Sequence, residues 1–282
     1  MAKRLPVSLG LLLFLSFCGS PLQAYKDVVF LHGLLAGAWE FDYFTDLIHK
    51  HHPGTKVYAV DMYSELSSII GLWQQEIKSV HQRSEAIFKK LKSGIISRGI
   101  LASVKHNVET FISLSAPLAG QFGDTDYLRF FFPLFIKDNI YRFFYTEEGQ
   151  DTSVGNYWLD PHHQELYRNY SVYLGFLNNE TVFINPQSEE YRQNFLRLKN
   201  LVLVGGPDDG VITPWQSSHF GAFDEKEVVQ PMRKQKWYLN DAFGLKTLDQ
   251  AGAIHMYTEP NVTHHFWHVK EKIFNKYILP WL

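Results

Sequence analysis

The sequence contains almost no cysteine. Its one cysteine in 282 residues is Cys18, which lies in a segment that we expect to be removed from the mature chain. Lys3 and Arg4 precede an apolar stretch over 9–17, and small residues follow it, which is typical of a secretory signal peptide. We therefore predict a signal peptide over 1–24 and a mature chain without a disulfide, a thiol nucleophile or a thiolate metal site.

Long apolar runs and net charge are also scarce. After residue 24 no run approaches the ~20 consecutive apolar residues that a membrane-spanning helix requires, so we expect no transmembrane anchor. The formal net charge of -2 gives no long-range attraction to nucleic acid, which we exclude as a partner. No break in composition divides the remaining chain, so we expect one domain over 25–282. These properties do not determine the oligomeric state.

Three sequons and many histidines indicate the cellular route. Asn169, Asn179 and Asn261 each begin an Asn-x-Ser/Thr triplet, which together with a signal peptide predicts a glycoprotein. The 13 histidines would gain charge in an acidic compartment. The sequons predict passage through the secretory pathway, and the histidines suit an acidic compartment such as the lysosome, with secretion as the alternative.

Apolar runs and helical patterns alternate along the chain. Short β-branched runs that end in glycine or a polar residue are typical of buried parallel strands. Their alternation with helices predicts an α/β fold with a mostly parallel sheet covered on both faces. An aromatic-rich region at about 121–194 lacks this alternation, so we expect a helical insertion there. The expected strands are 27–33, 57–62, 111–115 and 201–206, and the expected helices are 39–50, 72–91 and 266–278.

Polar groups at the ends of two predicted strands, and a histidine near the last helix, could carry chemistry. His32-Gly33-Leu34 follows the first strand, where a backbone N–H could approach an oxyanion, although a plain turn would look the same. The stretch Gly206-Pro207-Asp208-Asp209-Gly210 follows the fourth strand, and an aspartate there is either the carboxylate that orients a catalytic histidine or part of an Asx turn. The stretch 262–268, which contains three histidines, precedes the last helix in a loop of the kind that supplies a triad histidine.

A metal site is the other interpretation of the histidines near 264. His264 and His268 would need a third ligand and helical geometry, and no His-Glu-x-x-His pattern accompanies them. We therefore expect neither a metal nor a cofactor.

Five long stretches resemble the palmitoyl-protein thioesterase family, and within it the lysosomal type 2 enzymes. They are HNVETFISLSAP at 106–117, GQFGDTDYL at 120–128, NYWLDPHH at 156–163, LVLVGGPDDGVITPWQSS at 201–218 and FGLKTL at 243–248. The resemblance implies an α/β-hydrolase fold and hydrolysis of palmitoyl-protein or palmitoyl-CoA thioesters by a Ser-Asp-His triad. It also implies that Asp209 is the triad aspartate, His264 the triad histidine and Leu34 an oxyanion-hole donor. By position, the insertion matches the acyl-binding region of the family.

The sequence departs from this family at the nucleophile and at the disulfides. No pattern like Tyr-Ser-Gln-Gly-Gly occurs, and the nearest candidate is Ser97 in Ser97-Arg98-Gly99. The preceding residues, 89–96, contain three lysines and cannot form the buried strand that delivers an elbow serine. Phe144 and Val154 stand where family members of type 2 carry cysteines.

The spacing around Ser97 is also short. A loop, helix, strand, elbow and second helix need on the order of 55 to 60 residues, and only 48 lie between Tyr63 and Thr110 inclusive. The stretch 95–104 resembles the helix that follows the nucleophile in the family, joined directly to the preceding helix. This predicts that the strand and the nucleophile are absent.

Two main hypotheses follow from the sequence. In the first, the protein is a lysosomal thioesterase of long-chain acyl thioesters with Ser97 as its nucleophile. The alternative is a catalytically inactive family member, from a splice variant or an incomplete gene model, that only binds acyl chains or partners. An oxyesterase or lipase activity and a lectin-like binding module are two further candidates.

Overall fold

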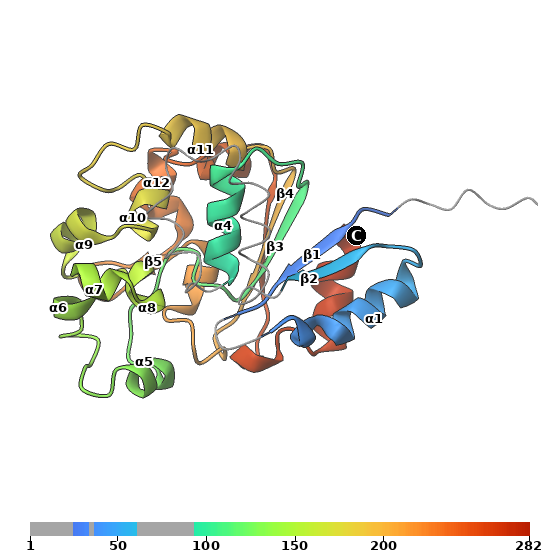
Figure 1. Ribbon diagram of the computed structural model, residues 1–282, viewed down its shortest axis with the longest axis horizontal. Helices are drawn as coiled ribbons and strands as arrows, with labels where there is room; N and C mark the ends of the chain where they lie inside the picture. The colour runs from blue at the N-terminus through green and yellow to red at the C-terminus, as the bar shows by residue number, and fades with distance from the viewer. Residues whose placement is uncertain (1–24, 34–36, 61–92) are drawn as a thin grey trace, which may run out of the picture.

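Five parallel strands form the framework of the part of the chain that the structure describes. The computed structural model describes residues 25–33, 37–60 and 93–282 (Figure 1). Strands β1 (Val28–Leu31) and β2 (Val57–Val60) pair in parallel, and β4 (Asn200–Gly205) lies between β3 (Thr110–Leu114) and β7 (Ile254–Thr258), parallel to both. Leu201 to Val204 are fully buried, as expected of a central strand covered on both faces. The prediction of an α/β fold with parallel sheets is confirmed.

Within the described residues, the parallel strands belong to two separate hydrogen-bonded sheets, β1–β2 and β3–β4–β7. No backbone ladder joins β1 to β3 within residues 25–33, 37–60 and 93–282. Side-chain packing connects the two sheets, because Val28 and Phe30 of β1 pack on a cluster that contains Val202 and Val204 of β4. The two sheets therefore share one apolar core, although no described backbone hydrogen bonds join them.

Helices cover both faces of this framework. Helix α1 (Asp42–His51) follows a 3-10 turn over Ala38–Phe41, and its residues Phe44, Leu47 and Ile48 are buried at helical spacing. Helix α4 (Ser93–Ser103) confirms the helix expected at 95–104. Figure 1 shows α1 and the red C-terminal helices on one side of β3 and β4, with α4 on the other.

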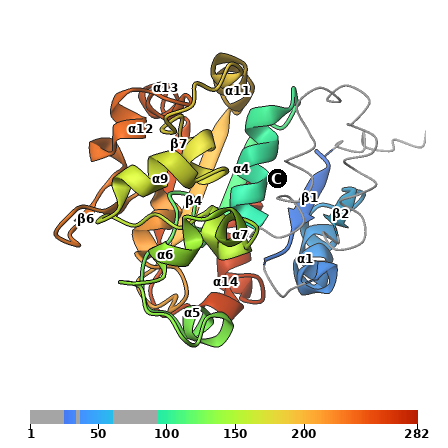
Figure 2. The same ribbon diagram turned by 60° about the vertical axis from the view of Figure 1, so that its left-hand side comes forward.

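The aromatic-rich region is built from short helices. Figure 2 shows α5, α6, α7 and α9 gathered on the face opposite α1. Threonine side chains at 125, 146 and 152 cap three of the helices by accepting a hydrogen bond from a backbone N–H group. These caps explain why a new helix begins at each of these positions. The helices are α5 (Asp126–Phe131), α6 (Tyr141–Phe144), α7 (Glu147–Gln150), α8 (Ser153–Asn156), α9 (Gln164–Tyr170), α10 (Leu174–Leu177) and α11 (Ser188–Phe195).

The C-terminal half contains two departures from the predicted elements. A short antiparallel pair, β5 (Ala222–Phe223) with β6 (Val229–Gln230), and helices α12 (Lys236–Leu239) and α13 (Leu245–Gln250) precede β7. The sequence analysis missed β7, because this half-exposed strand lacks a continuous apolar run. The expected helix at 266–278 was wrong at its start, since α14 (Glu271–Ile273) begins at Glu271 and continues into a π-helical turn over Phe274–Ile278. Before Glu271 the chain forms a 3-10 turn over His264–Phe266, and the side chains of His264 and Trp267 contact Asp209 beyond the end of β4.

Several expectations fall on other parts of the chain. The predicted signal peptide, the helix at 72–91, the last two residues of the strand at 57–62 and Leu34 lie outside the described residues. Among the helices of the described residues, none combines the length and the apolar character needed to cross a bilayer.

Candidate active site

Asp209 lies beyond the carboxyl end of the central strand β4, and its side chain is buried. Its Oδ1 accepts the backbone N–H groups of Val211 (3.0 Å) and Ile212 (2.8 Å), which is an Asx-type turn. Gly210 makes this turn possible by adopting a φ of 77°. The turn leaves Oδ2 of the same carboxylate available to other side chains. Oδ1 thus forms the Asx turn, while Oδ2 can orient a histidine.

His264 meets this second oxygen from a segment 55 residues further along the chain. The distance from its Nδ1 to Asp209 Oδ2 is 2.8 Å, and its backbone N–H donates to the carbonyl oxygen of Asp209 at 2.9 Å. A 3-10 turn over His264–Phe266 holds the ring in place. The His264 side chain is 24% exposed, whereas the Asp209 side chain is fully buried, so the histidine can face a substrate while the carboxylate cannot.

Two further side chains, missed by the sequence analysis, donate to the same carboxylate oxygen. Ser115 Oγ lies 2.7 Å and Trp267 Nε1 lies 2.8 Å from Asp209 Oδ2, and both residues are buried. Ser115 directly follows β3, the strand beside β4, and has a φ of 43°, in the left-handed region that a serine rarely adopts. Trp267 comes three residues after His264, and this proximity was the available sequence evidence for it.

These donors set the charge of the carboxylate. Burial by itself would raise the pKa of Asp209, but the hydrogen bond and charge of His264, the backbone N–H of Ile212 and the hydroxyl of Ser115 lower it to about 2. Asp209 is therefore ionised throughout the acidic range of a lysosome. An ionised carboxylate bonded to Nδ1 fixes the histidine tautomer that leaves Nε2 able to accept a proton.

The oxyanion segment is described only in part. His32 is fully buried just after β1, with its Nδ1 2.9 Å from the carbonyl oxygen of Gly33. Leu34, whose N–H is the expected donor, lies outside the described residues.

Ser97 lies inside a helix. It is the fifth residue of α4, is half-buried and stands between the buried residues Ile96 and Arg98. An elbow serine instead occupies a sharp turn between a strand and a helix. The start of α4 packs on the end of β3, because a Cβ added at Gly94 would lie 2.1 Å from Ala116 Cβ. The structure thus brings Asp209 and His264 together and places Ser97 in the second turn of α4.

Phe144 and Val154, which the resemblance places at cysteine positions, belong to an apolar core. Phe144 is fully buried, with its ring centre 5.0 Å from that of Phe132 and 5.2 Å from that of Trp158. Val154 is partly buried against the same cluster. Aromatic packing therefore occupies this region where the resemblance leads one to expect disulfides.

The histidines near 264 diverge from one another. His264 turns toward Asp209, whereas His268 Nε2 lies 4.0 Å from Glu40 Oε1. Within the part of the chain that the structure describes, no group of three or more potential metal ligands is found.

Comparison with known proteins identifies the family. The profile described as palmitoyl protein thioesterase matches residues 27–265. The chain belongs to this family. The lysosomal thioesterase PPT2 of Rattus norvegicus is 42% identical over 99% of this chain and 98% of its own length, and that of Homo sapiens is 41% identical over the same shares. The lysosomal thioesterase PPT2 homolog of Drosophila melanogaster is 39% identical over 100% of both chains.

The alignment with the Drosophila homolog is longer than this chain. It is 292 positions long and covers both chains, whereas this thioesterase family member has 282 residues. About ten positions of the relative therefore have no counterpart here. This number agrees with the shortage of about ten residues that the spacing around Ser97 predicts. The family has the α/β-hydrolase fold, with which the parallel sheets agree.

Proposed function

We propose that this protein is a lysosomal thioesterase that hydrolyses long-chain acyl thioesters, palmitoyl thioesters above all, with Asp209 and His264 as its general-base pair. The observation that carries this proposal is the 2.8 Å contact between His264 Nδ1 and the buried, ionised Asp209 carboxylate. Family membership supports the choice of a thioester as substrate. The relatives reported above carry thioesterase names, and they lend no support to the alternative of an inactive member.

The steps of thioester hydrolysis follow from the pairing of His264 with Asp209. His264 Nε2 takes the proton of a serine hydroxyl as its oxygen attacks the thioester carbonyl carbon, and Asp209 stabilises the imidazolium that forms. The C–S bond then breaks, and His264 returns the proton to the leaving thiolate. Water hydrolyses the acyl-enzyme in the same manner. The N–H of Leu34 and that of the residue after the nucleophile stabilise the negatively charged oxygen in both steps.

Ser97 has the role of nucleophile in this proposal, and its location makes it the first residue to test. Attack requires the Ser97 Oγ to come within about 2.6–3.2 Å of His264 Nε2. Because Ser97 has helical neighbours on both sides, the first turns of α4 would have to unwind for it to occupy an elbow.

The acyl chain needs an apolar surface, and the helical region offers one. Phe130, Leu134 and Ile136 are exposed on α5 and in the segment that follows it. Each methylene buried against such side chains contributes about 0.8 kcal/mol, so a sixteen-carbon chain gains far more than a short one. This surface is the proposed contact for the acyl chain.

The test combines a covalent label with turnover. The glycosylated protein is incubated with a fluorophosphonate probe and, separately, with palmitoyl-CoA, alongside the variants Ser97→Ala and Asp209→Asn. Labelling that is lost in Ser97→Ala and turnover that falls by about 10³ or more in Asp209→Asn would support the proposal. A folded protein that neither reacts with the probe nor hydrolyses palmitoyl-CoA would refute it, and labelling that persists in Ser97→Ala would refute Ser97 as the nucleophile.

The compartment is tested in cells. We expect the protein in lysosomal fractions, where Asp209 stays ionised because its pKa is about 2. Recovery of the protein only in the medium would favour secretion.

A further inference from the structure

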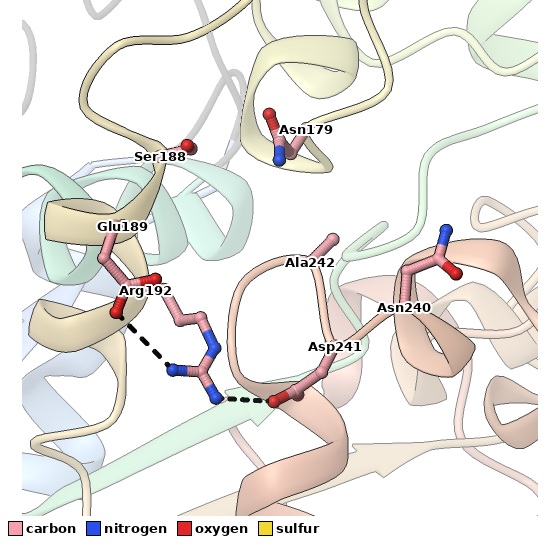
Figure 3. A pocket seen from close by; sticks show the side chains of 7 residues that line it. All are labelled: Asn179, Ser188, Glu189, Arg192, Asn240, Asp241 and Ala242. Carbon is pink, nitrogen blue, oxygen red and sulfur yellow. Dashed lines mark hydrogen bonds and ion pairs between the residues drawn. The ribbon is translucent and has the colours of Figure 1, made fainter.

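A polar hollow lies on the surface beside a glycosylation sequon (Figure 3). Its volume is about 390 Å³, and it lies between the end of α10, the start of α11 and the turn that joins α12 to α13. This volume falls within the roughly 300–1,000 Å³ of small-ligand pockets. The lining residues are Asn179, Ser188, Glu189, Arg192, Asn240, Asp241 and Ala242.

Asn179 is the first residue of the sequon Asn179-Glu180-Thr181, and its exposed side chain borders the hollow. Its backbone has a φ of 54°, and its N–H donates to the carbonyl oxygen of Phe176 at 3.1 Å. These constraints fix the direction of the Cα–Cβ bond. Figure 3 shows the Asn179 amide across the hollow from the carboxylate of Asp241. A group attached to its Nδ2 would therefore extend over the lining residues.

The floor of the hollow is held in place by a charged network. Arg192 Nη2 donates to Asp241 Oδ2 at 2.7 Å and to Thr247 Oγ1 at 3.0 Å, and Arg192 Nη1 lies 3.7 Å from Glu189 Oε1. Arg192, Glu189, Asn240 and Asp241 thus present both donors and acceptors to the hollow. Such a lining suits the hydroxyl and acetamido groups of a sugar and disfavours an alkyl chain.

We propose that this hollow holds the first two N-acetylglucosamine residues of an N-linked glycan on Asn179. The glycan comes from a lipid-diphosphate-linked oligosaccharide of the secretory pathway. The Asn179 Nδ2 forms a bond to the anomeric carbon of the first sugar and loses one proton, while the bond from that carbon to the lipid diphosphate breaks and the diphosphate leaves. The two sugars then lie on the floor formed by Arg192 and Asp241. The proposal does not depend on the thioesterase activity.

The other two sequons provide internal controls. Asn169 is exposed on α9, and its Nδ2 donates to the carbonyl oxygen of Glu165 at 2.9 Å. Asn261 is exposed in the loop between β7 and His264. Neither residue lines the hollow, so glycans on them should project into solvent.

The experiment measures how fast an endoglycosidase cuts between the two core sugars at each site. The full-length protein is produced in cells whose glycans stop at the high-mannose form, digested in its native state, and analysed site by site by mass spectrometry. We expect release from Asn179 to be about tenfold slower than from Asn169 and Asn261, because the enzyme needs a local opening to reach its bond. Heat denaturation should make the three rates equal.

A surface variant separates this hollow from other sources of protection. The double variant Glu189→Ala with Asn240→Ala removes two exposed sugar-facing groups and should bring the rate at Asn179 close to that of the other sites. Glu190 is an exposed neighbour outside the hollow, and Glu190→Ala should leave the release of the Asn179 glycan slow. The proposal is overturned if Asn179 carries no glycan while the other sites do, if its glycan is released as fast as theirs, or if the double variant stays protected.

Discussion

One carboxylate oxygen of Asp209 accepts hydrogen bonds from three side chains that come from two distant segments of the sequence. Ser115 comes from the end of β3, and His264 and Trp267 come from the segment that precedes α14. At the scale of single residues, this convergence keeps a buried carboxylate ionised and aims one histidine outward. Ser115 and Trp267 are positioning residues in this arrangement, because they act on the histidine through Asp209.

The residue-scale prediction concerns the acid titration of Asp209. Ser115→Ala should raise the pKa of Asp209 above its value of about 2, because one of the hydrogen bonds that lower it is lost. A depressed carboxylate pKa stabilises the fold above the unfolded pKa of roughly 3.9, and this stabilisation disappears as the pH falls through the folded pKa. In Ser115→Ala this stabilisation should therefore disappear at a higher pH than in the unsubstituted protein. Carboxyl NMR measures the pKa, and acid unfolding measures the stability. Ser218→Ala, a buried serine that bonds Trp215, is the control, and an equal shift there would contradict the prediction.

Helix α4 is tied to the helical region by a buried arginine. Arg98 donates to the carbonyl oxygens of Leu118 (2.9 Å) and Leu177 (3.2 Å) and to Asn178 Oδ1 (2.7 Å), and its guanidinium lies 4.0 Å from the ring centre of Phe243. Burial lowers the pKa of Arg98 to about 10, so the side chain stays charged at physiological pH. At the scale of elements, this one side chain connects α4 to the segments after β3 and α10.

We expect Arg98→Met to destabilise the fold by about 3 kcal/mol, because three buried acceptors lose their donor. Urea unfolding followed by tryptophan fluorescence measures the change. Arg129→Met, at an exposed position of α5, should change stability by less than about 0.5 kcal/mol. Similar effects of the two substitutions would show that Arg98 does not connect these elements.

Glu259 performs a comparable role between β7 and the C-terminal helices. Its buried carboxylate accepts hydrogen bonds from Lys276 Nζ (2.9 Å), Lys272 Nζ and Tyr277 OH. Burial would raise its pKa, but the Lys272, Tyr277 and Lys276 donors lower it to about 2. This contact anchors the chain on both sides of the segment that carries His264.

Glu259→Gln should reduce stability at pH 7 by about 2 kcal/mol, because an ionised acceptor of three donors becomes neutral. The difference from the unsubstituted protein should shrink as the pH falls from roughly 4.3 toward 2, where Glu259 itself becomes protonated. Thermal unfolding across this pH range gives the comparison. Glu225→Gln, at an exposed loop position, should show no such pH-dependent difference.

At the scale of the whole molecule, the parallel strands of the described residues belong to two sheets that share a core. Side chains of β1 and β4 meet in one cluster, yet no described ladder joins β1 to β3. The alignment with the Drosophila homolog leaves about ten of its positions without a counterpart. A strand of ordinary length, about 5–6 residues, together with an elbow would account for that number.

Inserting before Ser93 about ten residues that encode an apolar strand and a Tyr-Ser-Gln-Gly-Gly elbow tests the hypothesis, opposed to Ser97 as the nucleophile, that such a segment is absent from this chain. We expect the unfolding midpoint to rise by about 5 °C or more, since new ladder hydrogen bonds and buried apolar area both stabilise the native state. We also expect fluorophosphonate labelling on the inserted serine. A glycine-serine insert of the same length is the control. If both inserts behave alike, the two sheets are not separated by an absent strand.

The predictability of the elements depended on how continuous their apolar runs were. The predicted strand at 201–206 agrees within one residue with β4. A strand that is buried on both faces has an unbroken run of apolar residues, which the sequence shows directly. Strand β7 was missed because His255 interrupts its apolar pattern in a half-exposed strand of the sheet. The last helix was predicted too early because its start is set by the contacts of His264 and Trp267 with Asp209, which periodicity does not encode.

The sequence by itself determined the alternation of strands and helices, the capped short helices and the absence of a strand-like run before Ser97, since these depend on local periodicity and turn chemistry. Family resemblance named Asp209 and His264, but only the tertiary structure decided their contact, because it requires β4 and the segment after β7 to end at the same edge of the sheet. The tertiary structure also decided the hydrogen bond from Ser115 to Asp209 and the hollow beside Asn179. Each joins segments whose distance in space cannot be read from their distance along the chain.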